Sequence, residues 1–98
     1  MQELIKDLQN AAALYCEDRE AGKPTEWLRD GLQEIIKARN LETKYSTAEE
    51  ITARAYDQLE NIYKATQTKN TNKTRQQLNR LFNIYTLAGG VLTTYQII

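Results

Sequence analysis

Apolar residues recur three or four positions apart along most of this 98-residue chain, and that spacing constrains the fold more than any other feature. In the first twenty residues the series consists of Leu4, Ile5, Leu8, Ala11, Ala12 and Tyr15. This spacing places all of them on one side of a helix. With one proline and four glycines, the chain has little material for the many turns of an all-β fold. The pattern therefore predicts an all-α protein.

Signals that end and start helices separate four such series. Gly22 and Pro24 end the first, because glycine adopts the left-handed conformation of a helix C-terminus and proline cannot continue a helix. Thr25 is then expected to be the N-cap of the second helix. Ser46, followed by Glu49 three residues later, predicts a capping box at the start of the third. The predicted helices are about 2–20, 25–39, 47–66 and 73–88.

Short connections between four helices predict an antiparallel four-helix bundle, a single domain over residues 1–98. The polar stretch 67–72 is expected to be the loop before the fourth helix. The apolar tail 89–98 is expected to pack on the bundle. Gly31 interrupts the second apolar series, where it costs about 1 kcal/mol of helix stability relative to alanine, and we expect it to allow close helix contact.

The formal net charge is zero, which argues against a binder of bulk polyanions, but the charges are unevenly distributed. Residues 1–60 carry 8 basic and 13 acidic side chains, whereas residues 61–98 carry five basic side chains and no acidic one. The two parts therefore have net charges of −5 and +5. Either they face different environments, or a basic helix packs beside acidic helices within one bundle.

The absence of histidine removes most of the chemistry available to small enzymes. There is no imidazole acid or base, no Ser-His or Cys-His dyad and no histidine ligand for a metal. Ser46 is already assigned to a helix cap. Cys16 is the only cysteine, so it cannot form an internal disulfide, and we expect a half-buried structural thiol.

Carboxylates are the remaining candidates for catalysis or for an acid-only magnesium site. They cluster at Glu17, Asp18 and Glu20 and again at Glu49 and Glu50. The second pair is explained by its place in the first turn of a helix, where the dipole favours acids. We therefore predict a protein that is not an enzyme, with no catalytic residues, no cofactor and no metal.

Two further features concern partners. Trp27, the only tryptophan, is expected to be partly buried core beside Leu28, with a partner anchor as the alternative. The segment from Lys69 to Arg80 is the one basic patch. It is either a solvated loop and helix start or a surface that contacts phosphates of nucleic acid or lipid.

The order of the parts in the chain resembles a known family. The resemblance is clearest in the second helix and in the fourth helix with the residues that follow it. The motifs are Leu28-x-x-x-Leu32-x-x-Ile35, Leu78-x-x-Leu81-x-x-Ile84, Leu87-Ala88-Gly89-Gly90 and Val91-Leu92-Thr93-Thr94-Tyr95. Over nearly its whole length the chain is similar to the immunity proteins for pediocin-like (class IIa) bacteriocins, the enterocin A immunity family.

That resemblance implies a cytoplasmic four-helix bundle without enzymatic activity, which protects a Gram-positive cell from a pore-forming peptide. Such proteins bind the bacteriocin-occupied membrane receptor, the mannose phosphotransferase permease, from inside the cell. The N-terminus carries acids and no apolar core, so we expect no signal peptide. We also expect a monomer that binds no nucleic acid and associates transiently with the inner face of the membrane.

The family associates its C-terminal half with recognition. Carried onto this chain, the residues expected to bind the partner are Lys69, Lys73, Arg75, Arg80, Tyr85, Val91, Leu92 and Tyr95. The alternative function is a small helical nucleic-acid-binding or regulatory module that uses the basic 69–80 segment.

Overall fold

The computed structural model describes residues 2–42 and 47–88 of the chain, with side chains for 3–42 and 47–85. The described residues form four helices and no strand, which confirms the predicted all-α four-helix bundle. The helices are α1 (Gln2–Glu20), α2 (Trp27–Ala38), α3 (Ala48–Gln67) and α4 (Thr71–Ala88). The tail 89–98, which the sequence predicts to pack on the bundle, lies outside the described residues.

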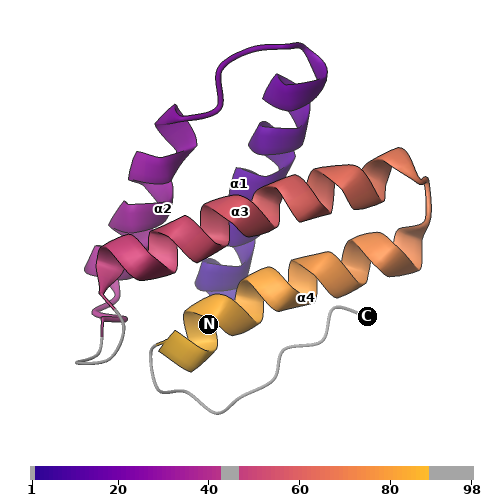
Figure 1. The fold of residues 1–98 in the computed structure, drawn as a ribbon. Coiled ribbons are helices and arrows are strands. Elements are labelled where there is room, and N and C mark those ends of the chain that lie inside the picture. The colour runs from indigo at the N-terminus through magenta and orange to yellow at the C-terminus, as the bar shows by residue number, and fades with distance from the viewer. Residues whose placement is uncertain (1, 43–46, 89–98) are drawn as a thin grey trace.

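The helices form two antiparallel pairs, and α3 and α4 lie across α1 and α2 (Figure 1). Helix α3 is central, because its contacts with the other three helices are the most extensive in the bundle. Among the described residues, no helix combines the length and the apolar character needed to cross a membrane.

All four predicted apolar series contribute to one core. Its large, fully buried side chains are Leu8, Leu32, Ile36, Ile51, Leu59, Leu81, Phe82 and Tyr85. Because each helix buries one stripe of its surface against the others, the hydrophobic effect holds the two pairs together.

The predicted N-caps of α2 and α3 are wrong. The N-cap of α2 is Glu26, and the hydroxyl of Thr25 is hydrogen-bonded to the Tyr56 hydroxyl at 2.7 Å. Thr25 is buried, so its hydroxyl needs a hydrogen-bond partner inside the protein, and this bond connects the residue just before α2 to α3.

The N-cap of α3 is Thr47, whose hydroxyl accepts a hydrogen bond from the backbone N–H of Glu50 at 3.3 Å, so the motif shifts by one residue. Ser46 lies outside the described residues.

The C-terminus of α1 follows the prediction. Gly22 has a φ of +72°, and the backbone N–H of Lys23 donates to the Asp18 carbonyl at 2.8 Å. This is the left-handed helix end that glycine adopts at no steric cost. Helix α2 ends in the same way at Asn40, where φ is 53°.

Helix α4 begins two residues earlier than predicted. The side-chain oxygen of Asn70 accepts from the backbone N–H groups of Asn72 and Lys73, at 3.0 and 3.2 Å. This cap lets the helix start at Thr71, and the predicted loop 67–72 shrinks to three residues.

Polar contacts join α1 to α3. Tyr15 donates a hydrogen bond to Glu60, and the Arg19 guanidinium donates two more to the same carboxylate, at 3.0 and 3.2 Å. The hydrogen bonds from Arg19 and Tyr15 hold the pKa of Glu60 below its ordinary value. Burial and the Glu60 carboxylate raise the pKa of Tyr15. The cluster therefore favours an ionised Glu60 and a neutral Tyr15.

Candidate basic groove between α3 and α4

A groove of about 430 Å³ runs between α3 and α4 on the surface. It is lined by Asn61, Lys64, Ala65, Thr68, Lys73, Gln76, Gln77 and Arg80. Three cations and three side-chain amides thus share one concave surface, which we call the basic groove.

Helix geometry explains why these residues gather. On α4, Lys73, Gln77 and Arg80 are four and three positions apart and form one stripe. On α3, Asn61 and Lys64 are three positions apart and form the facing stripe. Because the two helices lie side by side, the stripes become opposite walls (Figure 1).

A hydrogen-bonded chain of amides holds the walls in place. The buried Gln58 side chain donates to the backbone carbonyl and to the side-chain oxygen of Gln77, each at 2.9 Å. Asn61 donates in turn to the Gln58 oxygen at 3.1 Å. Since this network is formed by the protein itself, the groove does not need a ligand to set its shape.

The electrostatics of the groove favour an anion. Lys64, Lys73 and Arg80 are exposed, and none of them forms an ion pair within the part of the chain that is described. Lys73 lies in the first turn of α4, where the helix dipole disfavours a cation, so its position does not serve helix stability. The arrangement can hold phosphate or carboxylate groups through charge-assisted hydrogen bonds.

The structure brings together only some of the residues predicted from the sequence. Lys73 and Arg80 line the basic groove. Lys69, at the α3–α4 turn with a φ of 57°, and Arg75 are exposed outside its lining. The remaining three in the tail, Val91, Leu92 and Tyr95, lie outside the described residues.

The prediction for Tyr85 is wrong. Its side chain is fully buried at 0% exposure, and its hydroxyl donates to the backbone carbonyl of Leu32 at 3.0 Å. This bond satisfies the one polar atom of a large core residue and connects α4 to α2. Tyr85 is therefore a core residue that no partner can reach on the folded surface, and its burial raises the pKa of the hydroxyl.

The prediction missed Lys64 and the amides. Lys64 lies on α3, outside the continuous basic segment, and only the pairing of α3 with α4 places it in the same groove as Lys73 and Arg80. The spacing of Lys73, Gln77 and Arg80 in the sequence indicates that they share one helix face. This face is found only when the helical period is applied to polar residues as well as to apolar ones.

Trp27 also differs from expectation. Its side chain is 53% exposed, and the indole N–H donates to an Asp18 carboxylate oxygen at 2.9 Å. Trp27 precedes the core series of Leu28 and Leu32 by one position, which turns it away from the core. It is a surface residue rather than partly buried core.

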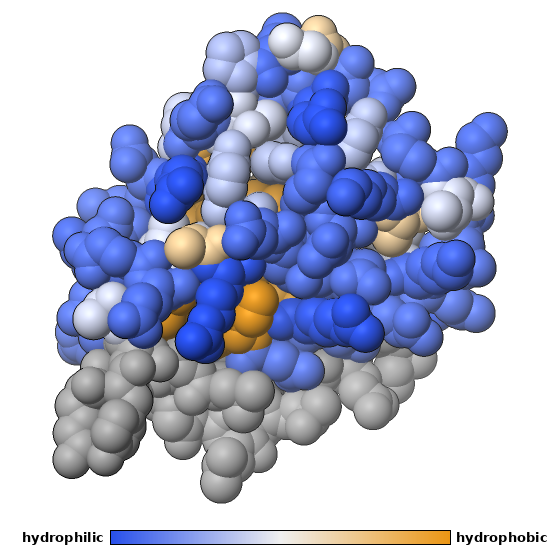
Figure 2. All heavy atoms as spheres, viewed as in Figure 1, coloured by the Kyte–Doolittle hydropathy of each residue, from blue (hydrophilic) through white to orange (hydrophobic). Residues whose placement is uncertain are grey.

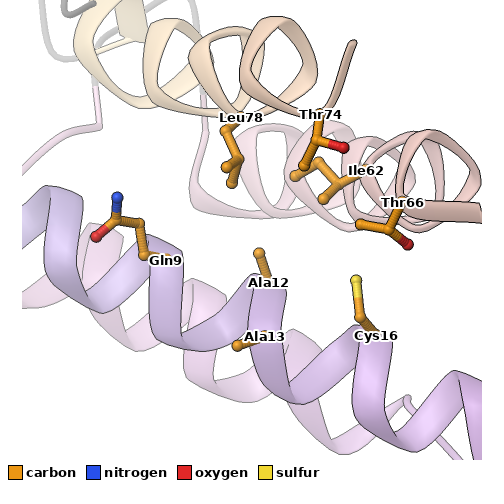
Figure 3. A pocket seen from close by; sticks show the side chains of 8 residues that line it. All are labelled: Gln9, Ala12, Ala13, Cys16, Ile62, Thr66, Thr74 and Leu78. Atoms are coloured by element: carbon orange, nitrogen blue, oxygen red, sulfur yellow. The ribbon is translucent and has the colours of Figure 1, made fainter. Parts of the chain in front are cut away.

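A second hollow, of about 370 Å³, lies between α1 and the α3–α4 pair. Figure 3 shows Cys16 on α1 pointing toward Ile62 and Thr66 on α3, with Leu78 on α4 completing the lining. Burial raises the pKa of the Cys16 thiol, which lowers its thiolate fraction at neutral pH. Cys16 is half-buried, as predicted, and its environment disfavours reactivity.

The side of the molecule where α3 and α4 lie in front is mostly hydrophilic, with a few hydrophobic residues visible between polar ones (Figure 2). Among the described residues, no group of three or more Cys, Asp or Glu side chains lies close enough to hold a metal ion. The basic groove is a concave surface that gathers three cations on the α3–α4 pair. Comparisons of the chain with models of protein families, with curated proteins and with solved structures give no match.

Proposed function

We propose that this chain is a cytoplasmic immunity protein that protects a Gram-positive cell from a pediocin-like bacteriocin. It acts by binding the bacteriocin-occupied mannose phosphotransferase permease from inside the cell, without enzymatic activity. The sequence resemblance motivates the proposal. The four-helix fold agrees with what the resemblance implies about architecture.

The basic groove is the observation that supports this proposal most. Lys64, Lys73 and Arg80 converge on the C-terminal pair of helices, in a stretch with no acidic residue after Glu60. A receptor in the inner leaflet is surrounded by anionic lipid headgroups, which attract clustered Lys and Arg. A cationic groove on the half associated with recognition would hold the protein against such a partner.

The test is protection of bacteriocin-sensitive cells that express the chain. We expect survival against at least one peptide of a pediocin-like panel. We expect the triple variant Lys64→Gln, Lys73→Gln, Arg80→Gln to lose protection while its helical circular dichroism and thermal midpoint stay unchanged.

The matched control is Lys6→Gln, Lys23→Gln, Lys37→Gln, which removes the same charge from exposed positions in and between α1 and α2. It should protect like the wild type. Failure to protect against the whole panel would refute the immunity function. Equal protection by both triple variants would refute the role of the basic groove.

The same groove favours a second candidate, a nucleic-acid-binding module, because three cations can contact phosphates. No aromatic residue lines the groove for base stacking, so binding would be to the backbone. Titration of the protein with DNA at low salt tests this second candidate. Binding that weakens steeply with salt and is lost in the Lys64, Lys73, Arg80 variant would support this candidate, and no binding would reject it.

A further inference from the structure

The α1–α2 pair exposes an apolar groove on a different part of the surface. It has a volume of about 250 Å³, and its lining includes Ala11, Leu14, Trp27, Gly31 and Ile35. We call it the α1–α2 groove. Leu14 and Trp27 are 41% and 53% exposed, and they are the most exposed large hydrophobic residues described. The fold of this chain therefore leaves both side chains largely in contact with water.

Gly31 has no internal reason to be a glycine. A β-carbon added there would meet no atom within 4 Å, and its backbone conformation is ordinary for a helix. The expectation that Gly31 allows close contact between this chain's own helices is therefore wrong. Glycine in a helix interior sacrifices helix stability. Because Gly31 lies in the floor of the α1–α2 groove, its missing side chain leaves room for the backbone of something outside the chain.

Three unpaired acids lie beside this groove. Glu17 follows Leu14 by three positions, Asp30 follows Trp27 by three, and Glu34 follows Gly31 by three, so each lies one turn from a lining residue. All three acids are exposed, and none forms an ion pair within residues 3–42 and 47–85.

The arginines of the same two helices are occupied elsewhere. Arg19 is paired with Glu60 on α3 at 3.0 Å, and the Arg29 guanidinium lies over the Tyr56 ring at 5.3 Å. Both interactions direct positive charge toward α3 rather than toward the groove. Arg39, directly after α2, pairs at 2.7 Å with Asp7, which lines the groove, so the charge of that acid is neutralised. Elsewhere the surface around Leu14 and Trp27 is apolar in its centre, with the exposed acids Glu17, Asp30 and Glu34 beside it.

We propose that the α1–α2 groove binds a cationic amphipathic helix of another polypeptide. An apolar groove between two helices fits a third helix that inserts an apolar stripe, with Gly31 allowing close approach. Lysines or arginines beside that stripe would meet Glu17, Asp30 and Glu34. From Trp27 to Ile35 the groove spans roughly 12 Å of helix axis, which accommodates about two turns of the partner.

A second copy of this chain does not meet these requirements. Its most basic helix is α4, but the apolar stripe of α4 is Leu81, Phe82 and Tyr85, and all three are buried in the core. A folded copy therefore cannot present cations and an apolar stripe together on that helix. The partner that fits carries both on one free helical face.

Trp27 makes the test direct, because it is the only tryptophan and lies in the groove. The probe is a synthetic peptide of about 18 residues, with leucine at helical spacing and lysine elsewhere and no tryptophan. The matched control peptide has glutamate in place of lysine. We expect the Leu/Lys peptide to shift Trp27 emission to shorter wavelength in a saturable way, and the Leu/Glu peptide to leave it unchanged.

Two variants sharpen the test. Gly31→Gln places a polar side chain in the floor and should weaken binding about tenfold or more. Ala21→Gln, which adds the same side chain at an exposed position outside the lining, should bind like the wild type. The triple variant Glu17→Gln, Asp30→Asn, Glu34→Gln should also weaken binding and should flatten its salt dependence.

Three results would overturn the proposal. The first is an equal shift, or no shift, with the two peptides. The second is equal affinity in wild type and Gly31→Gln with helical content preserved. The third is a dimer in sedimentation that Gly31→Gln dissociates, which would assign the groove to a second copy of the chain.

Discussion

The α1–α2 pair and the α3–α4 pair each carry a groove between their helices, and the two grooves have opposite character. The α1–α2 groove is apolar, has exposed Trp27 and Leu14, and lies beside the unpaired acids Glu17, Asp30 and Glu34. The basic groove has three cations and a network of amides, and α4 buries its aromatic residues, Phe82 and Tyr85, in the core.

The opposite character of the two grooves explains how the zero net charge is distributed over the molecule. The opposite charges of the two parts do not simply neutralise each other across the bundle. The ion pairs described are Arg19 with Glu60 and Arg39 with Asp7, and neither uses a cation of the basic groove. Asp7 lines the α1–α2 groove, whereas Glu17, Asp30 and Glu34 beside that groove form no ion pair among the described residues. The fold leaves both sets of charges at the surface, where each is available to a different partner.

The first prediction compares the loss of stability when an aromatic residue is removed from each helix pair. Phe82→Ala removes a ring that is 1% exposed and should lower the free energy of unfolding by about 3–5 kcal/mol. Trp27→Ala removes a larger side chain, yet it should cost clearly less than Phe82→Ala because about half of the Trp27 residue is already in water. Urea denaturation followed by circular dichroism measures both. Similar losses would contradict the assignment of Trp27 to the surface.

The next prediction concerns the basic groove and anionic membranes. Each Lys or Arg near such a surface contributes about 1 kcal/mol, so Lys64→Gln, Lys73→Gln, Arg80→Gln should weaken binding to phosphatidylglycerol-containing vesicles about a hundredfold. Wild-type binding should fall with added salt. Lys6→Gln, Lys23→Gln, Lys37→Gln is the control, and a loss of similar size in that variant would make the attraction a property of total charge rather than of the groove.

Much of the fold follows from the sequence, because the hydrophobic effect acts on a pattern that is visible there. Leu28, Leu32 and Ile36 are buried as their spacing predicts. Trp27 shows the limit of the pattern, since one position decides whether a helical residue faces the core or water. Its neighbour Leu28 is buried, and Trp27 is not.

The candidate site was less predictable, because it depends on which helices lie side by side. Lys73 and Arg80 could be identified from their charge alone. Lys64 could not, since it joins them only through the packing of α3 on α4. Tyr85 was included among the partner-binding residues only through the family resemblance, and the Leu32 carbonyl that holds its hydroxyl in the core is 53 residues away in sequence.

A third prediction concerns the contact between the two pairs. Glu60→Gln should lower the free energy of unfolding at pH 7 by about 1 kcal/mol, through weaker hydrogen bonds with Tyr15 and Arg19. The effect is modest because the Arg19 side chain is 46% exposed and water screens its charge.

The pH dependence of this effect has a definite sign. Because folding lowers the pKa of Glu60, its carboxylate stabilises the protein above the pKa of the unfolded chain, and this contribution is lost as pH falls through the folded-state pKa. The difference between wild type and Glu60→Gln should therefore shrink below about pH 4. A difference that stays constant from pH 7 to pH 3 would show that the ionised form is not what the contact stabilises.

The smallest effect separates stability from binding in the α1–α2 pair. Gly31→Ala should raise the free energy of unfolding by about 0.5–1 kcal/mol, because alanine has the higher helix propensity and its β-carbon meets nothing. The measurement is the urea midpoint at constant m-value. A close internal contact at Gly31 would instead make the variant less stable, and that result would remove the reason for assigning the open floor of the groove to an external helix. If alanine stabilises the fold and also weakens binding of the Leu/Lys peptide, then the glycine lowers helix stability and keeps the groove accessible to the peptide. The α1–α2 groove would then differ from the basic groove, whose walls are held by hydrogen bonds of the protein itself.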